Sequence, residues 1–448
     1  MNCKFSTVVF ACLFSMLFLI RPVQAHLSEN DIRVGIWANQ RNILVSADSD
    51  YEIVDADTNK SLGRLSANEK ATIAFNTGGF TLNGKRINAV RLSLLKLKND
   101  NEHFIEINKK QYRGNVDIHI TRSNTGMTVV NTLPIEEYLY GIIAKEISPN
   151  WPLEAVKAQA VAARTYALYN KNKHQSDGYD VCATTDCQVY GGRESEVARA
   201  IKAVDATAGL VILYQGKLIP AYFHSSSGGF TENSENVWGT YLPYLRGVVD
   251  YDQKSPKYNW EKQLTSSEIE EALSKAGYNL GRIQAIGVSP LTVQPMNMID
   301  RGISGRVKII RFIGENGSIQ LSGENLRRIL SLKSTLFDVK ILLPVQKSIE
   351  FEITDKVGNQ GSKKIQINLP PTNEKGFVTD KNDIHRITGR SNEIISISGY
   401  GWGHGVGLSQ WGAKAMAEQG PQDDSTYFKE ILKHYYQGVE IKKLPKGV

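Results

Sequence analysis

The chain has 448 residues, of which 41% are hydrophobic and 22% charged, and it carries a net charge of +7 at neutral pH. This length allows two or three domains with separate cores, and the composition is that of an ordinary globular protein. No run of basic residues is dense enough to indicate nucleic-acid binding, so we expect no nucleic-acid partner.

The first 25 residues have the pattern of a cleaved signal peptide. Lys4 precedes an almost wholly apolar run at residues 7–20, and residues 23–25 form a small-residue cleavage site before His26. The run is short for a membrane span, which needs about 20 residues, so an uncleaved anchor is the less favoured alternative. We therefore expect an exported protein of the periplasm or cell wall.

Removal of residues 1–25 takes away Lys4 and Arg21 and no acidic residue, so the net charge falls from +7 to +5. A mildly basic exported protein can associate peripherally with anionic wall polymers or with lipid headgroups at a membrane surface.

Residues 26–125 read as a β-rich module. Alternating strands at 32–37 and 42–46 are separated from later ones by turn signals at 57–60 and at Asn83-Gly84. The region has no catalytic constellation, and we expect a wall-binding or packing module or plain scaffolding.

Residues 132–146 predict one helix whose last residue is a carboxylate. Ile135, Leu139, Ile142 and Ile143 form an apolar stripe at helical spacing, and Glu146 falls in the middle of it. A carboxylate on such a face either pairs with a cation or has its pKa raised by desolvation, which would make it a general acid. The alternative is a frayed last turn that leaves Glu146 in water.

Residues 152–168 predict a second, alanine-rich helix that begins with proline. Lys157 and Arg164 share its apolar face with Leu153, Ala160 and Leu168. Two cations so placed indicate either buried structural ion pairs or a polar cluster with Glu146 that binds substrate.

The rest of the chain predicts an α+β protein with several domains. Residues 126–250 would form the first part of a mixed helical and β catalytic core with a cleft, including a loop at 178–192, a short helix at 198–207 and β structure at 210–224. Residues 251–340 form an inserted α/β segment, in which 265–268 make a capping box closed by Gly277 and 306–321 make a hairpin. Residues 341–448 would form the second part of the core, with strand-like residues at 344–380 and a helix at 425–436.

Two segments could line a site. His224 lies next to Ser225 and Ser226, an arrangement that rarely serves a serine nucleophile, so we interpret these residues as polar lining for a polyhydroxylated ligand or as a structural turn. The glycine run at 399–407 carries Tyr400, Trp402 and His404, whose rings suit sugar stacking or a core, and Gln410 follows it.

Five segments, in order, resemble the stage II sporulation protein D (SpoIID/LytB) family. They are residues 134–141, Glu146 with 151–166, 187–192, 223–238 and 399–413. The resemblance covers roughly residue 115 to the C-terminus, with a less typical stretch in the middle.

That resemblance implies a peptidoglycan lytic transglycosylase, in which one glutamate serves first as acid and then as base while the muramic acid 6-hydroxyl attacks C1. The family's catalytic glutamate falls on Glu146, and some relatives prefer glycan stripped of its stem peptides. The residues within segments that resemble the family's substrate-binding motifs are Lys157, Arg164, Gln188, Tyr190, His224, Ser225, Ser226, His404 and Gln410.

Two rival functions stay open. Some family members are described as stimulating a wall amidase, so the chain could bind glycan or that amidase without cutting. A hydrolytic muramidase would need a second carboxylate, for which Glu232 and Asp186 are the candidates.

Only Cys182 and Cys187 remain after signal cleavage. Two nearby thiols in an oxidising compartment favour a disulfide. Some family members bind zinc at this loop through cysteine and histidine, and His174 and Asp186 would complete such a site here, although the spacing departs from theirs. Two free thiols are the third option, and no cofactor is required by the expected reaction.

Overall fold

The computed structural model describes residues 30–98, 102–342, 348–354, 360–366, 384–389 and 393–444. The chain divides into two compact units, Met1–Leu133 and Pro134–Val448. The predicted signal peptide lies outside the described residues, and among those residues no helix has the length and apolar character needed to cross a membrane. Helices and sheets occur together, which confirms the predicted α+β class.

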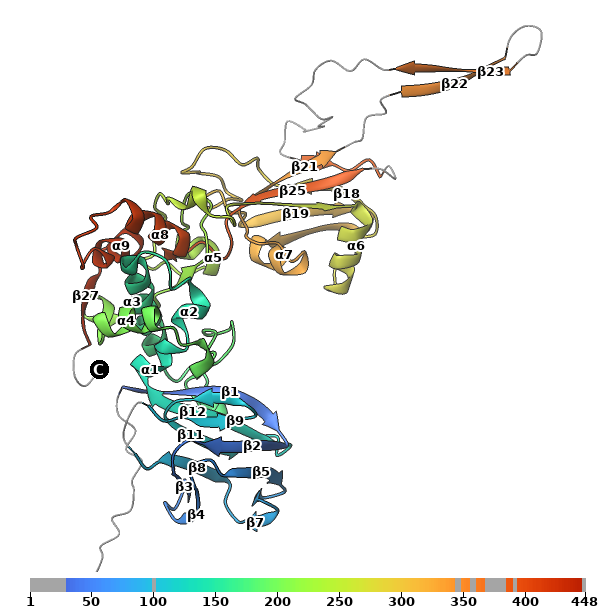
Figure 1. Ribbon diagram of the computed structural model, residues 1–448. Coiled ribbons are helices and arrows are strands. Elements are labelled where there is room, and N and C mark those ends of the chain that lie inside the picture. Colours follow the sequence, from blue (N-terminus) through green and yellow to red (C-terminus); the bar gives the residue numbers. More distant parts are fainter. Residues whose placement is uncertain are drawn as a thin grey trace, which may run out of the picture. The chain divides into compact units, whose positions relative to one another are not determined.

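The first unit is built from two mainly antiparallel sheets (Figure 1). One has the strand order β1 (Asp31–Gln40), β12 (Met127–Pro134), β11 (Asn115–Ile120), β8 (Arg91–Lys96), β3 (Tyr51–Asp55) and β4 (Ser61–Leu65). The other has the order β10 (Lys110–Tyr112), β9 (Ile105–Ile107), β2 (Asn42–Ala47), β5 (Lys70–Asn76), β6 (Gly79–Leu82) and β7 (Lys85–Ile87).

Alternation of apolar residues explains these strands. On β2, Ile43, Val45 and Ala47 are buried while the residues between them face outward, as expected for a sheet with one covered face. The predicted turn at Asn83-Gly84 joins β6 to β7, and both residues have positive φ. The predicted end of this module at residue 125 is too early, because β12 pairs with β11 and completes its sheet.

The second unit has a helical core around α3 (Leu153–Tyr169). Figure 1 shows α4 (Ala198–Ala206), α8 (Gln410–Gln419) and α9 (Phe428–Tyr435) gathered about it, and each contacts α3. A small sheet of β15 (Lys217–Leu218), β14 (Leu210–Tyr214) and β27 (Glu440–Lys443) also packs on α3. The alanines of α3 let these elements approach closely, because Ala155, Ala158 and Ala162 belong to the core.

The predicted helix at 132–146 is two short helices, α1 (Ile135–Tyr140) and α2 (Ile143–Glu146). They separate at Gly141, where an added Cβ would lie 2.5 Å from Cε2 of Tyr190. The apolar stripe is nevertheless buried as predicted. At the break, the carbonyl of Gly141 accepts a hydrogen bond from the N–H of Gly191 at 3.1 Å, so a distant loop takes the place of the next helical turn.

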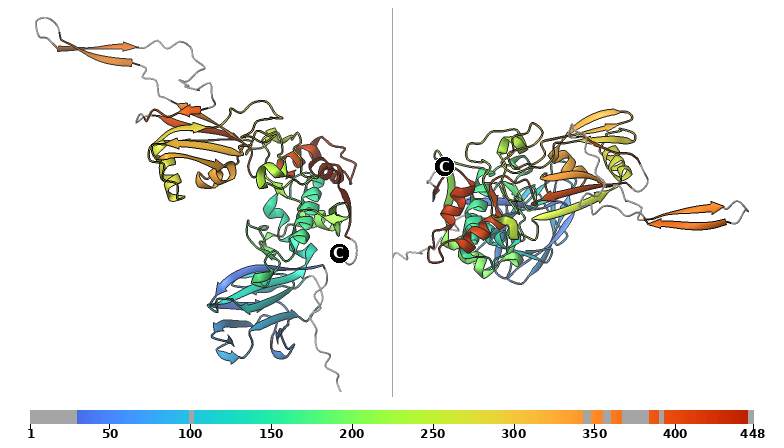
Figure 2. Two further views of the ribbon diagram at one scale, coloured as in Figure 1. Left: turned by 180° about the vertical axis from the view of Figure 1, so that it is seen from behind. Right: turned by 90° about the horizontal axis from the view of Figure 1, so that it is seen from above.

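The inserted segment is an α/β body with its own core. One sheet has the order β20 (Gly317–Ser322), β19 (Ile309–Gly314), β18 (Ile283–Gly287) and β24 (Ile384–Arg386), and the other β17 (Asn259–Leu264), β25 (Ile394–Tyr400) and β21 (Phe337–Leu342). Helices α6 (Ser266–Lys275) and α7 (Gly323–Ile329) cover one side (Figures 1 and 2). β22 (Ser348–Thr354) and β23 (Gln360–Gln366) form a separate hairpin.

The insertion extends further along the chain than predicted. β24 and β25 come from residues assigned to the second part of the core, yet they pair with β18, β17 and β21. The insertion therefore ends near Tyr400, and the core resumes with the glycine run. The predicted capping box at Thr265 and Glu268 is confirmed at the start of α6.

Candidate functional site

Glu146 ends α2 and lies partly buried. Burial raises the pKa of its carboxyl group, while hydrogen bonds from the backbone N–H of Val189 and from the side chain of Gln410 pull the pKa back in part. No described cation forms an ion pair with it. The prediction of a desolvated carboxylate with a raised pKa is thus confirmed, and the frayed, water-exposed alternative is wrong.

Three distant segments meet at this carboxylate. Val189 lies between Gln188 and Tyr190 on the loop whose tyrosine ring packs against Gly141. Gln410 is the first residue of α8, whose N-cap Ser409 accepts a hydrogen bond from the N–H of Gly412. Sequence reasoning missed Val189, because a backbone donor leaves no side-chain signal.

The segment with His224 and the glycine run at 399–407 lie side by side, which is necessary if both are to line one site. β16 (Phe223–His224) is parallel to β26 (Leu408–Ser409), and Ser226 forms a bridge with Trp402. The N–H of Trp411 donates to the carbonyl of Ser225 at 3.1 Å. Gly403 has a φ of +109°, and a Cβ there would lie 2.9 Å from that of His224, so glycine is needed for this approach.

The two histidines are neutral near pH 7. His404 donates from Nε2 to the carbonyl of Phe223 and accepts at Nδ1 from the N–H of Val406, and burial together with Arg306 lowers its pKa to about 3. Burial, His404 and Arg306 also place the pKa of His224 well below its usual value. Nδ1 of His224 faces the carbonyl of Val406, and its buried Nε2 has no hydrogen-bond partner among the described residues. Nε2 of His224 is therefore a buried hydrogen-bond acceptor that no described residue uses.

The three serines differ in environment. The hydroxyls of Ser226 and Ser227 are fully buried and donate to Asp252 and Asp250, so they brace the segment and are no nucleophiles. The Ser225 hydroxyl lies 3.4 Å from Nζ of Lys257. Ser225 therefore differs from the other two serines, because it is partly exposed and its hydroxyl lies near a lysine and not an aspartate.

Lys157 and Arg164 do not join Glu146. Nζ of Lys157 bonds Glu154 at 2.7 Å and the carbonyl of Ser425 at 2.8 Å. The guanidinium of Arg164 is fully buried, binds both oxygens of Glu136 and donates to the carbonyls of Val204 and Leu210. Both residues form the buried structural ion pairs that the sequence left open as the alternative. The prediction that they bind substrate is therefore corrected.

Gln188 and Tyr190, which flank Val189, are both buried. Gln188 donates to the carbonyl of Ala163 at 3.2 Å and accepts from the hydroxyl of Tyr138 at 3.3 Å. The rings of Tyr138 and Tyr190 lie 5.2 Å apart. These two residues hold the segment that carries Val189.

The candidates for a second carboxylate are occupied elsewhere. Glu232 is fully buried and accepts hydrogen bonds from backbone and side-chain donors of Asn233, Asn236, Ile303 and Ser304. Asp186 is paired with Lys173 at 2.9 Å beside the cysteines. Glu232 therefore has no free carboxylate oxygen for a hydrolytic reaction, and Asp186 lies in the cysteine loop.

The cysteine loop gathers four potential metal ligands. Donor atoms of His174, Cys182, Asp186 and Cys187 all lie within 4.8 Å of one another. Both cysteines are free thiols, with sulfurs 2.8 Å apart, and burial raises the pKa of Cys187 to about 12. Nδ1 of His174 faces Asp177, and Nε2 faces Cys187 at 3.5 Å, the arrangement that orients a metal-binding imidazole. This mixed sulfur, nitrogen and oxygen set fits zinc.

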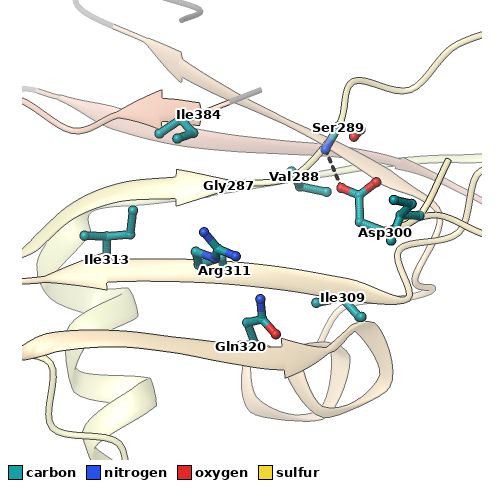
Figure 3. A pocket seen from close by; sticks show the side chains of 10 residues that line it. Gly287, Val288, Ser289, Asp300, Ile309, Arg311, Ile313, Gln320 and Ile384 are labelled. Atoms are coloured by element: carbon teal, nitrogen blue, oxygen red, sulfur yellow. Dashed lines mark hydrogen bonds between the residues drawn. The ribbon is translucent and has the colours of Figure 1, made fainter. Parts of the chain in front are cut away.

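A pocket of about 290 Å³ lies elsewhere, on the open face of the inserted sheet (Figure 3). Ile309, Ile313 and Ile384 line it with Arg311 and Gln320, and Asp300 accepts from the N–H of Ser289 at its rim. It contains no part of the Glu146 arrangement, which is the candidate site.

Two protein-family models match parts of the chain. The model of a family described as stage II sporulation protein (SpoIID) matches residues 123–214, and a domain of unknown function (DUF8618) matches residues 240–358. An uncharacterized protein of Brachyspira hyodysenteriae is 31% identical over 94% of this chain and 95% of its own length.

Two further relatives carry functional names. The amidase enhancer of Bacillus subtilis is 31% identical over 78% of this chain and 46% of its own length, so the match spans about half of that protein. Stage II sporulation protein D of Bacillus amyloliquefaciens is 29% identical over 70% of this chain and 76% of its own length.

Proposed function

Because the chain belongs to the stage II sporulation protein D family, we propose that it is an exported peptidoglycan lytic transglycosylase that acts in the periplasm or cell wall. The observation that carries the proposal is Glu146, a carboxyl group with a raised pKa that accepts two hydrogen bonds and forms no ion pair with a described cation. A raised pKa increases the protonated fraction that can act as an acid near neutral pH.

The proposed reaction needs one carboxyl group. Glu146 donates its proton to the glycosidic oxygen as the bond from C1 of N-acetylmuramic acid to N-acetylglucosamine breaks. The 6-hydroxyl of the muramic acid then forms a bond to C1, and its proton passes to Glu146. The product is 1,6-anhydro-N-acetylmuramic acid, and the carboxyl group returns to its protonated state without water being consumed.

The surrounding groups support both halves of this cycle. The Val189 N–H and the Gln410 side chain stabilise the carboxylate after it has given up its proton and hold its orientation. Neutral His224 and His404 cannot compete as acids near pH 7. Glycan stripped of stem peptides is the expected substrate.

The same loop is proposed to bind zinc through His174, Cys182, Cys187 and Asp186. Zinc would hold the loop two residues before Val189, and it would supply rigidity and no reaction step. A disulfide between Cys182 and Cys187 is the alternative cross-link that would hold this loop.

A second function is favoured by one finding, the similarity to a protein named amidase enhancer. In that case the chain would bind glycan or a wall amidase and increase amidase activity without cutting glycan itself.

Mass spectrometry of purified glycan strands separates these functions. Strands with and without stem peptides are incubated with the wild type and with Glu146→Gln. Anhydromuramic products from the wild type, reduced about a thousandfold or more in the variant, are expected. Reducing-end products would indicate a hydrolase, and no cleavage by folded protein, with stimulation of an amidase, would favour the enhancer.

A further inference from the structure

The insertion places two lysines around an aromatic ring of the glycine run. Nζ of Lys257 lies 5.0 Å from the ring centroid of Trp402, and Nζ of Lys333 lies 4.6 Å from it. Both lysines are exposed, and so is Trp402. The backbone fixes the arrangement, because the N–H of Gly403 donates to the carbonyl of Lys333 and that of Gly401 to the carbonyl of Tyr258.

Neither ammonium group has a described counter-ion. No described carboxylate forms a salt bridge with Lys257 or Lys333, whereas Lys414, which lies over Trp411, is paired with Glu418 at 2.9 Å. A ring attracts a cation but does not neutralise its charge. Two like charges held around one ring therefore create a positive potential that favours an anion.

These charges adjoin the Glu146 site. Lys257 contacts the hydroxyl of Ser225, and the carbonyl of Ser225 accepts from the N–H of Trp411. Trp411 follows Gln410, whose side chain bonds Glu146. The insertion thus contributes cations at the edge of the proposed glycan site.

We infer that Lys257 and Lys333 recognise the free lactyl carboxylate of muramic acid and so select glycan without stem peptides. The inference rests on the proposed function, because it assumes that glycan binds beside Glu146. In peptide-bearing glycan that carboxylate is an amide, which has no charge to pair with the lysines. The insertion is then a specificity element of the enzyme.

Binding measured with Glu146→Gln tests this without turnover. The probes are peptide-free glycan strands and the same strands after reduction of the lactyl carboxylate to an alcohol. We expect Lys257→Gln or Lys333→Gln to weaken binding of the carboxylate strand about fivefold, and both together about twentyfold. Binding of the reduced strand should change less than twofold, and added salt should weaken only carboxylate binding.

Lys254→Gln is the matched control, because Lys254 is exposed on the same segment and lies over no described aromatic ring. Thermal unfolding of each variant checks that the fold is retained. Equal affinity of the parent for both strands, or an equal loss with Lys254→Gln, would overturn the inference.

Product analysis keeps the two proposals apart. Lysine-dependent binding of carboxylate strands without any anhydromuramic product would leave the inference standing and reject the transglycosylase. Anhydromuramic product formed equally well from carboxylate and reduced strands, by the wild type and by the double lysine variant, would reject the inference alone.

Discussion

Arg164 and Glu146 are both ionisable residues of the helical core, but they differ in burial and in the partners that they contact. Arg164 is fully buried and meets Glu136 and two carbonyls. Glu146 is partly buried, and its partners among the described residues are the neutral donors Val189 and Gln410. A buried charged group whose hydrogen bonds are all made to protein partners has a structural role. A desolvated carboxyl group that lacks a neighbouring cation has a raised pKa and can transfer a proton.

Arg164→Met is expected to have the largest effect, which is a loss of stability. The variant leaves the partly exposed Glu136 without its cation and removes a fully buried donor from the carbonyls of Val204 and Leu210, so we expect a loss of about 3–5 kcal/mol in the free energy of unfolding. Urea denaturation measures this loss. A double variant, Arg164→Met with Glu136→Met, should lose less than the single one, and a single variant of unchanged stability would contradict the structural role.

Gly141→Ala tests how the loop that carries Val189 is held against α1 and α2. The new Cβ would lie 2.5 Å from Cε2 of Tyr190, so the ring must move and carry Val189 with it. We expect a loss of about 1–3 kcal/mol in stability and a lower rate of anhydromuramic product formation. Gly287→Ala is the control, because its backbone is not in the positive-φ region and a Cβ there would meet only the Cβ of Arg311, at an ordinary contact distance of 3.6 Å. Equal activity of Gly141→Ala and wild type would show that the loop does not need this contact.

The zinc proposal predicts a smaller effect on activity. Cys187→Ser leaves only the Cys182 thiolate, so it should reduce the thiolate-to-metal absorption that cobalt gives at such sites by about half or more, and it should reduce product formation about tenfold, because Val189 lies on the same loop. Elemental analysis of purified protein gives the zinc content. Protein without metal whose mass shows two fewer hydrogens when unreduced would instead support the disulfide.

The smallest expected effect is the pH dependence of stability caused by Glu146. Its folded-state pKa is raised, so the folded chain holds a proton that the unfolded chain has released, and stability falls as pH rises from the unfolded value of 4.5 through the folded pKa. Glu146→Gln should remove this loss and raise Tm at pH 7 by about 1–3 °C. The difference should vanish at pH 4. A lower Tm of the variant at pH 7 would mean that the charged form is stabilised by the fold.

Much of the local structure could be predicted from sequence, because it depends on neighbours in the chain. The alternation on β2, the turn at Asn83-Gly84 and the capping box at Thr265 each contain their own hydrogen-bonding or burial pattern. The five family segments identified Glu146, Gln410 and the His224 region, which the structure brings together.

The partners of charged residues were decided only by the tertiary structure. Periodicity placed Lys157 and Arg164 on an apolar face, but it could not tell whether Glu146, Glu136 or Glu154 would meet them. In the same way, the break at Gly141, the donor Val189 and the lysines beside Trp402 depend on packing between distant segments. A side chain's face follows from local geometry, whereas its partner and its pKa follow from which distant groups exclude water around it.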